Sequence, residues 1–114
     1  MKLKKKVSEQ IPVLSKKEAL VLELLLKNPS TEKYGLEIVS ESDNELSRGT
    51  VYVTLSRMED KGYVESRLEE PDRPMSGLPR RLYRVTGYGQ KAFGIWEMAR
   101  ELGRLHTAEM GGVS

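Results

Sequence analysis

Arginine and hydroxyl side chains gather in two stretches of the sequence, and both residue types suit the binding of nucleic acid. In residues 47–62 the acids lie only at the carboxyl end, so the amino-terminal half is free of them. The basic residues of this stretch are Arg48, Arg57 and Lys61. Residues 71–85 hold one acid, Asp72, beside Arg73, Arg80, Arg81 and Arg84. An arginine can donate two hydrogen bonds to guanine, and hydroxyl groups suit phosphate oxygens.

Acidic residues gather in a different part of the chain, between residues 32 and 45. They are Glu32, Glu37, Glu41, Asp43 and Glu45. The formal net charge of +2 neither proves nor excludes a nucleic-acid partner, because the placement of the charges decides this. A basic front and an acidic back are expected of a DNA-binding domain, and the alternative is that the arginines only solvate a surface.

Residues suited to catalysis or metal binding are scarce. The sequence has no cysteine and one histidine, His106, so neither a catalytic triad nor a metal cluster of familiar form can be assembled. We therefore expect no enzyme, no cofactor and no metal. The lack of cysteine also favours the reducing cytoplasm. No apolar run approaches the roughly 18 residues of a membrane span, and no signal-peptide core follows the lysine-rich start.

Helix caps and periodicity predict the elements that position these residues. Ser15, followed three residues later by Glu18, is a capping box, and the apolar run at 19–26 predicts a buried central helix. Residues 34–41 predict a short second helix after a break at 28–30. A basic extension, residues 1–14, precedes both. Its spacing leaves two interpretations open, a frayed tail or a short amphipathic helix.

The third predicted helix runs from a cap at Ser47 to about Lys61, where Gly62 would close it. One stripe of this helix, Val51, Leu55 and Met58, is expected to face the core. The opposite face would be free to touch a partner. We assign to it Arg48, Thr50, Val53, Thr54 and Arg57.

A change to the two-residue period predicts a β-hairpin after the third helix. Residues 63–70 and 80–85 read as its strands, and the loop 71–79 between them has three prolines and a glycine. A projecting hairpin with basic flanks is typical of the wing of a winged helix.

The last predicted helix starts at a cap, Thr86, and reaches about His106. An apolar stripe along it would be a liability unless a second copy of the chain covered it. The stripe contains Ala92, Ile95, Trp96, Ala99, Leu102 and Leu105. Residues 107–114 have no pattern and are predicted to be a disordered tail.

This order predicts a mainly α fold with a small β-hairpin, a winged helix-turn-helix. The winged helix would cover residues 15–86 and a dimerisation helix residues 87–106. In such a fold the third helix enters the major groove and the wing lies along the neighbouring backbone.

Three motifs in order resemble the PadR family of transcriptional regulators. They are LSRGTVYVTLSRMEDKGYV at 46–64, PRRLYRVT at 79–86 and YGLEI at 34–38. The resemblance covers roughly residues 15–105, and it departs from the family pattern at Val53, where a proline is common, and at Gly87 and Tyr88. It implies that Ser47, Arg48, Thr50, Tyr52 and Arg57 face DNA. The basic cluster of the predicted wing adds Arg73, Arg80 and Arg81 as expected DNA contacts. Tyr52 could equally be a residue at the edge of the core with its hydroxyl in water.

The resemblance also implies a homodimer joined through the last helix, with an inverted-repeat operator whose half-sites lie roughly 34 Å apart. Repression is the expected activity. Some relatives bind planar aromatic effectors, and Trp96 could stack on one, or it could simply pack at the dimer seam. Two alternatives remain: a winged helix that binds proteins and not DNA, and a winged-helix regulator of another family.

Overall fold

This computed structural model describes residues 13–69 and 80–113, with side chains up to residue 105. The described residues form four helices and three short strands. The helices are α2 (Lys16–Leu26), α3 (Gly35–Glu41), α4 (Arg48–Asp60) and α5 (Gly87–Val113), and the strands are β1 (Lys33–Tyr34), β2 (Val64–Leu68) and β3 (Arg81–Val85). The order confirms a mainly helical winged helix. Among the described residues no helix is long and apolar enough to cross a membrane.

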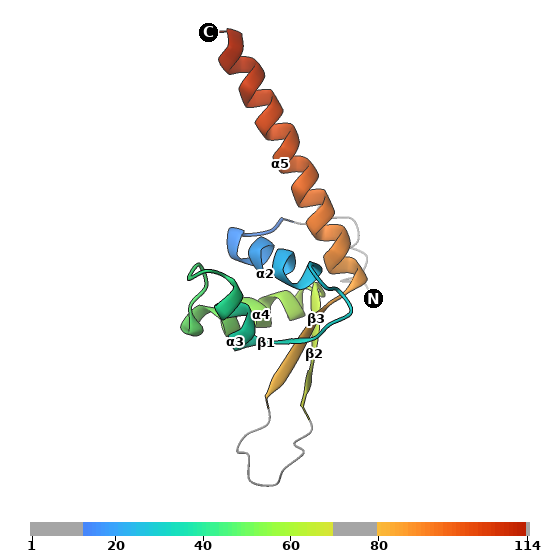
Figure 1. The fold of residues 1–114 in the computed structure, drawn as a ribbon. Helices are drawn as coiled ribbons and strands as arrows, with labels where there is room; N and C mark the ends of the chain where they lie inside the picture. The colour runs from blue at the N-terminus through green and yellow to red at the C-terminus, as the bar shows by residue number, and fades with distance from the viewer. Residues whose placement is uncertain (1–12, 70–79, 114) are drawn as a thin grey trace.

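The elements form a small body with two projections (Figure 1). Helices α2, α3 and α4 pack together, α5 extends away on one side, and the β2–β3 hairpin, which we call the wing, extends on the other. The loop 71–79 and most of the basic extension 1–14 lie outside the described residues. Of the extension, Leu14 is buried in the core and Val13 is exposed.

Each helix cap predicted from the sequence is present. Ser15 and Glu18 form the capping box of α2, and the Ser47 hydroxyl accepts a hydrogen bond from the Thr50 N–H at the start of α4. Gly62 has a φ of +85°, the left-handed conformation that favours glycine after a helix. These caps fix where the two helices begin and where α4 ends.

The core lies where α2 meets α4, α5 and the sheet. Helix α2 has buried residues on most of its faces, as its composition predicts. The largest fully buried side chains are Val21, Leu22, Leu25, Ile38, Leu46, Val51, Leu55, Met58 and Val64. Burial of this apolar surface supplies most of the free energy that holds α4 and its outward face in place.

The sheet has three strands, not the two of the predicted hairpin. Strand β1 pairs antiparallel with β3, with Lys33 opposite Tyr83 and Tyr34 opposite Leu82, which gives the order β1-β3-β2. Two residues are too few for a two-residue period to be visible, so this strand could not be predicted. Its pairing places Tyr34 and the start of α3 beside the loop-side half of β3.

Helix α5 differs from the prediction in its length and in the residues of its stripe. It continues to Val113, past the predicted end at about His106, so the predicted tail 107–114 is helical as far as Val113. Ala108, Glu109 and Met110 are good helix formers, which outweighs the missing apolar pattern. Ala92, assigned to the dimer stripe, is fully buried in the core of its own domain.

Candidate nucleic-acid interface

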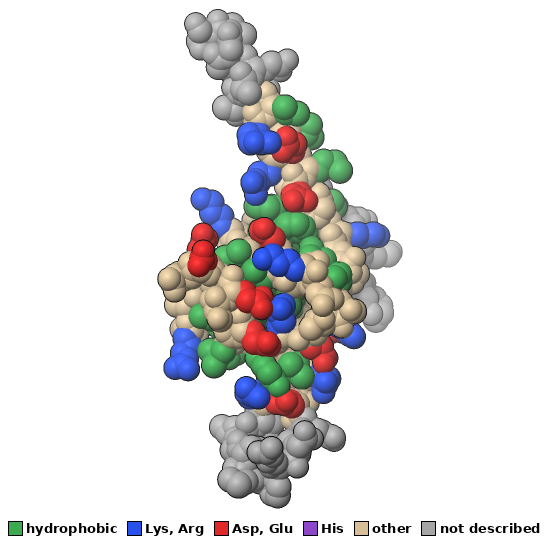
Figure 2. Space-filling model, in the orientation of Figure 1, with side chains coloured by type: hydrophobic (Ala, Val, Ile, Leu, Met, Phe, Trp, Pro, Cys, Tyr) green, Lys and Arg blue, Asp and Glu red, His purple; other side chains and the backbone are tan. Residues whose placement is uncertain are grey.

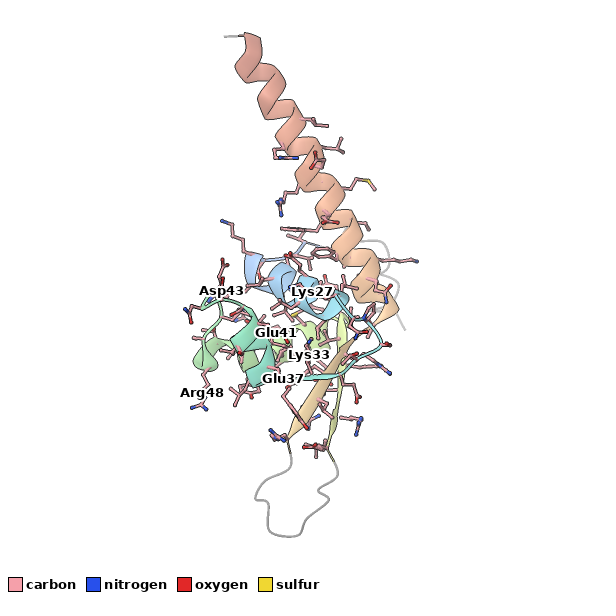
Figure 3. The ribbon with its side chains drawn as sticks, in the orientation of Figure 1. Lys27, Lys33, Glu37, Glu41, Asp43 and Arg48 are labelled. Atoms are coloured by element: carbon pink, nitrogen blue, oxygen red, sulfur yellow. The ribbon has the colours of Figure 1, made fainter. Side chains whose placement is uncertain are left out.

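The outward face of α4 carries two arginines that no acid neutralises within the described residues. Arg48 lies in the first turn and points away from the body of the domain (Figure 3), and Arg57 lies farther along the exposed face. The structure brings neither side chain into an ion pair with a described carboxylate. This surface therefore presents positive charge at Arg48 and Arg57, and its amino-terminal half is free of acids, as the sequence predicts.

The hydroxyls of Ser47 and Thr50 position the start of α4. The two oxygens lie 3.0 Å apart, and the Thr50 N–H donates to the Ser47 Oγ over 3.2 Å. Both residues lie at the exposed end of the helix beside Arg48, so they can hold the helix terminus and still face a duplex.

Thr54 does not belong to the outward face. Its side chain is buried, with 8% of the residue exposed, beside Val51, Leu55 and Met58. The prediction was wrong because a threonine of intermediate polarity fits either side of a helix. The exposed apolar residues of α4 are instead Tyr52 and Val53, with 44% and 52% exposed.

Tyr52 is packed on one side and exposed on the other. A Cβ atom at Gly35 would lie 2.5 Å from Cε1 of Tyr52, so the ring packs directly against the backbone of α3. The other side of the residue is exposed. This contact explains the glycine at the start of α3, where a side chain would collide with the ring.

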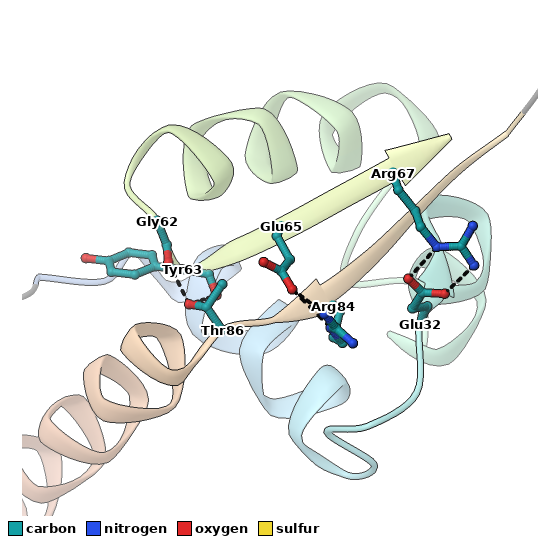
Figure 4. Close-up of polar contacts among 7 residues, drawn as sticks. All are labelled: Glu32, Gly62, Tyr63, Glu65, Arg67, Arg84 and Thr86. Carbon is teal, nitrogen blue, oxygen red and sulfur yellow. Dashed lines mark hydrogen bonds and ion pairs between the residues drawn. The ribbon is translucent and has the colours of Figure 1, made fainter. Parts of the chain in front are cut away.

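Acids from β2 and the segment before β1 neutralise much of the wing's charge. Arg84 donates to Glu65, and Arg67 forms a two-pronged ion pair with Glu32 (Figure 4). The hydrogen bond from Arg67 lowers the pKa of Glu32, and the one to Glu65 raises the pKa of Arg84. The charge separation predicted from the sequence is therefore weaker at the wing, because pairing across strands is not visible in sequence order.

Arg80 and Arg81 lie at the loop end of β3, close to α3 and α4. The Arg80 guanidinium lies 4.0 Å from the centre of the Tyr34 ring, and its Nε is 3.5 Å from Glu69. Arg81 donates to the Ser66 hydroxyl over 3.0 Å. Arg73, the third wing residue predicted to contact DNA, lies outside the described residues.

The acidic residues gather on α3 and the turn after it, where Figure 3 shows Glu37, Glu41 and Asp43. Two of them are engaged locally: Glu37 accepts from the Tyr34 N–H at 2.7 Å, and Glu41 pairs with Lys33 at 3.0 Å. These contacts stabilise α3. The acids that make them do not pair with the arginines of α4.

Helix α5 exposes an apolar stripe beyond the body of the domain. Green side chains alternate with charged ones along it in Figure 2. The exposed fractions are 40% for Ile95, 65% for Met98, 61% for Leu102 and 58% for Leu105. Ala99 is exposed as well. Met98 was missing from the predicted stripe, although its spacing of three from Ile95 and four from Leu102 places it there.

Trp96 faces the domain and not the exposed stripe. Its ring is stacked on Phe93 with centroids 5.7 Å apart, and the Arg100 guanidinium lies 5.1 Å from its centre. A groove of about 470 Å³ runs beside it, lined by Lys16, Ala19, Leu20, Glu23, Glu45, Trp96 and Arg100. Its partly buried ring packs on the core.

No group of three histidine, cysteine or carboxylate side chains that could hold a metal occurs in the described part of the chain. The site consists instead of an exposed basic helix, a hairpin beside it and a projecting helix. Together these define a winged helix-turn-helix domain of the kind that binds DNA.

Residues 21–95 match the model of the transcriptional regulator PadR-like family. The chain therefore belongs to this family of transcription regulators and is not an enzyme.

Solved structures share the fold. A PadR family transcription regulator from Clostridium difficile R20291 is 26% identical, with a TM-score of 0.65 over 82% of this chain and 96% of that one. A PadR-like transcription factor from Bacteroides fragilis is 22% identical, with a TM-score of 0.69 over 82% of this chain and 88% of that one. A PadR family regulator from Eggerthella lenta is 20% identical, with a TM-score of 0.66 over 82% of each chain. No curated protein sequence matches the chain.

Proposed function

We propose that the chain binds a specific duplex sequence as a homodimer and represses the promoter that contains it. One observation carries this proposal: the exposed face of α4 holds Arg48 and Arg57 without an acidic partner among the described residues. Contacts in which an arginine donates two hydrogen bonds to guanine are the commonest specific contacts in the major groove. Helix α4 would enter that groove with Ser47, Thr50 and Tyr52 near the phosphates.

The wing would contact the backbone on the side of the groove. Arg80 and Arg81 lie at the loop end of β3, and Arg73 falls in the loop that would extend along the duplex. Contacts of this type add affinity without adding sequence information. The regulator would act in the cytoplasm, together with the DNA that it regulates.

The dimer part of the proposal is supported by the α5 stripe. Ile95, Met98, Leu102 and Leu105 expose 40–65% of their surface on one face of a helix that projects from the domain. A second copy packed along α5 would cover this face and bring the two α4 helices to one side. Two-fold symmetry then requires an inverted-repeat operator with half-sites roughly 34 Å apart.

Repression would follow from occlusion of the promoter by the bound dimer. Deletion of the gene is expected to raise the target transcript, measured by quantitative reverse transcription. An unchanged or lowered transcript would contradict repression while leaving DNA binding intact.

A small aromatic effector is a second element of the proposal, and its supporting observation is the groove beside Trp96. Pockets of a few hundred Å³ bind small molecules, and an aromatic ring could replace Arg100 over the indole. Titration with planar aromatic compounds should quench the Trp96 fluorescence and weaken DNA binding. If no compound quenches the fluorescence, Trp96 only packs on the core. Quenching without any change in DNA affinity would mean that the compound binds but is not an effector.

The decisive experiment is fluorescence anisotropy with the full chain and two duplexes, one from its own upstream region and one scrambled, each at two salt concentrations. Preferential binding that weakens steeply with salt is expected. Equal binding to both duplexes would be followed by selection from a randomised duplex pool. No binding to any duplex at low salt would favour the protein-interaction module, in which loss of charge at Arg48, Arg80 and Arg81 is tolerated.

A further inference from the structure

A pocket of about 240 Å³ lies where the start of α3, the middle of α4 and the loop end of β3 meet. Its lining residues are Tyr34, Gly35, Leu36, Tyr52, Arg80 and Arg81. They include two guanidinium groups and two phenols, and none of them is acidic. A water molecule in the liquid occupies about 30 Å³, so the pocket has room for a phosphate group with several waters.

Tyr52 brings a hydroxyl donor to this pocket from the recognition helix α4. The bare backbone of Gly35 lets the ring lie against α3, where a Cβ atom would be 2.9 Å from the hydroxyl oxygen. In the described part of the chain no group accepts or donates a hydrogen bond at this hydroxyl. Tyr52 is therefore held in place and keeps its donor for a ligand.

Arg81 brings a guanidinium whose orientation is set by a short chain of hydrogen bonds. Its Nη1 donates to the Ser66 Oγ at 3.0 Å, and that hydroxyl donates to Glu59 of α4 at 2.8 Å. A guanidinium has five N–H donors, and this contact uses one of them. The hydrogen bonds thus fix Arg81 between the wing and α4 and leave most of its donors for an anion.

Arg80 contributes a second positive charge to the pocket, and this charge is already paired with Glu69. Its guanidinium lies over the Tyr34 ring, 4.0 Å from the ring centre. Glu69 accepts a hydrogen bond from the Tyr34 hydroxyl and forms an ion pair with Arg80, whose Nε lies 3.5 Å from Oε1. The hydrogen bond to the Glu69 carboxylate raises the pKa of the Tyr34 hydroxyl. Glu69 is thus the carboxylate next to the pocket, and it competes with any anion for Arg80.

We propose that this pocket binds a single backbone phosphate of the duplex, held by Arg81 and Tyr52, and that Glu69 limits the contribution of Arg80. The inference rests on the proposed DNA binding and names the atoms that would fix the wing relative to α4. A phosphate fits because the lining carries two positive charges and a hydroxyl donor, and because the pocket opens beside the exposed face of α4.

Methylphosphonate scanning tests this assignment. A duplex selected from a randomised pool by the wild-type chain is resynthesised with one phosphate at a time replaced by a neutral methylphosphonate. One position in each half-site should weaken wild-type binding about tenfold. That penalty should vanish in Arg81→Gln and shrink in Tyr52→Phe, while penalties at other phosphates stay. The proposal would be overturned if Arg81→Gln and Tyr52→Phe lost the penalty at different phosphates, or if both variants kept the wild-type penalty.

Glu69→Gln tests the competing carboxylate. The amide keeps an acceptor for Tyr34 but loses its charge, so DNA affinity should rise about threefold and the salt dependence of log K should steepen. Arg104→Gln, which removes a cation of α5 paired with Glu101 at 2.7 Å, is the matched control and should change neither quantity. Circular dichroism of every variant establishes that it is folded. An affinity of Glu69→Gln equal to or below wild type would refute the role of Glu69, whereas a wild-type chain that selects no duplex refutes DNA binding itself.

Discussion

The Nζ of Lys61 lies 2.8 Å from Oε2 of Glu18, and this ion pair joins the carboxyl end of α4 to the first turn of α2. The Glu18 side chain is 5% exposed, and its other oxygen accepts from the Ser15 N–H. Lys61→Met would leave a buried carboxylate without its cation. We expect the free energy of unfolding to fall by about 1–2 kcal/mol in urea denaturation. Lys27→Met, at an exposed lysine with no ion pair to a described residue, should change it by less than about 0.5 kcal/mol.

Two glycines of the first turn of α5 should respond oppositely to alanine. A Cβ at Gly89 would lie 2.2 Å from the Tyr63 carbonyl oxygen, whereas a Cβ at Gly87 would meet nothing within 4 Å. Gly89→Ala should therefore lower the free energy of unfolding by about 1–3 kcal/mol, and Gly87→Ala should leave it unchanged or raise it by up to about 1 kcal/mol. Thermal unfolding followed by circular dichroism measures both. Equal melting temperatures for the two variants would contradict the close packing of α5 on Tyr63.

Two buried tyrosines should make the fold sensitive to alkaline pH. Burial raises the pKa of Tyr63 and of Tyr83 above the ordinary 10.0. Because the folded-state pKa values are raised, their contribution to stability is complete below the unfolded value of 10.0 and is lost as the pH rises through the folded values. Unfolding by urea between about pH 8 and about pH 11 should show the decline only at the upper end. Tyr83→Phe should make it shallower, and a decline that begins near neutral pH would point to other groups.

Arg48→Ala should weaken specific DNA binding without unfolding the chain. An arginine that contacts a base contributes about 1–3 kcal/mol, so affinity for the selected duplex should fall about tenfold or more, and preference at one base position should relax. Anisotropy titration with a set of single-base variants measures both effects. Arg104→Ala on α5 is the control and should bind like wild type. If Arg48→Ala lost affinity equally for all duplexes, Arg48 would be a phosphate contact and not a base contact.

Leu102→Glu should prevent dimerisation. The charge would fall in the middle of the stripe formed by Ile95, Met98 and Leu105, where a partner helix would have to desolvate it. Sedimentation equilibrium should show monomer at concentrations where the wild type is a dimer. Glu97→Lys is the control, because Glu97 is exposed on another face of α5 about 120° from the stripe. A dimer that survives Leu102→Glu would place the interface elsewhere.

Local signals in the sequence were enough to predict most of the fold. Hydroxyl caps at Ser15, Ser47 and Thr86 and the left-handed Gly62 act within one turn of chain, so their effects do not depend on the rest of the protein. The core stripe of α4 also follows from periodicity alone. The outward position of Arg48 could be predicted for the same reason.

What the sequence did not reveal depends on contacts between distant residues. Strand β1 exists because Lys33 and Tyr34 pair with β3, and the charge of Arg84 is balanced by Glu65 across the hairpin. Ala92 is buried because α5 crosses the core at that turn, while Met98 lies beyond it. The pocket between Tyr34 and Arg81 likewise joins residues far apart in the chain.

A single residue, Thr86, separates β3 from α5. Its hydroxyl donates to the carbonyl oxygens of Gly62 and Tyr63 at 2.6 and 3.0 Å (Figure 4). It also accepts from the Gly89 N–H at 2.9 Å. These three hydrogen bonds hold the end of β3 and the start of α5 in one arrangement relative to the end of α4. We therefore expect α5 and the hairpin to move together, so that the angle between the two α5 helices of a dimer would set the distance between its two wings.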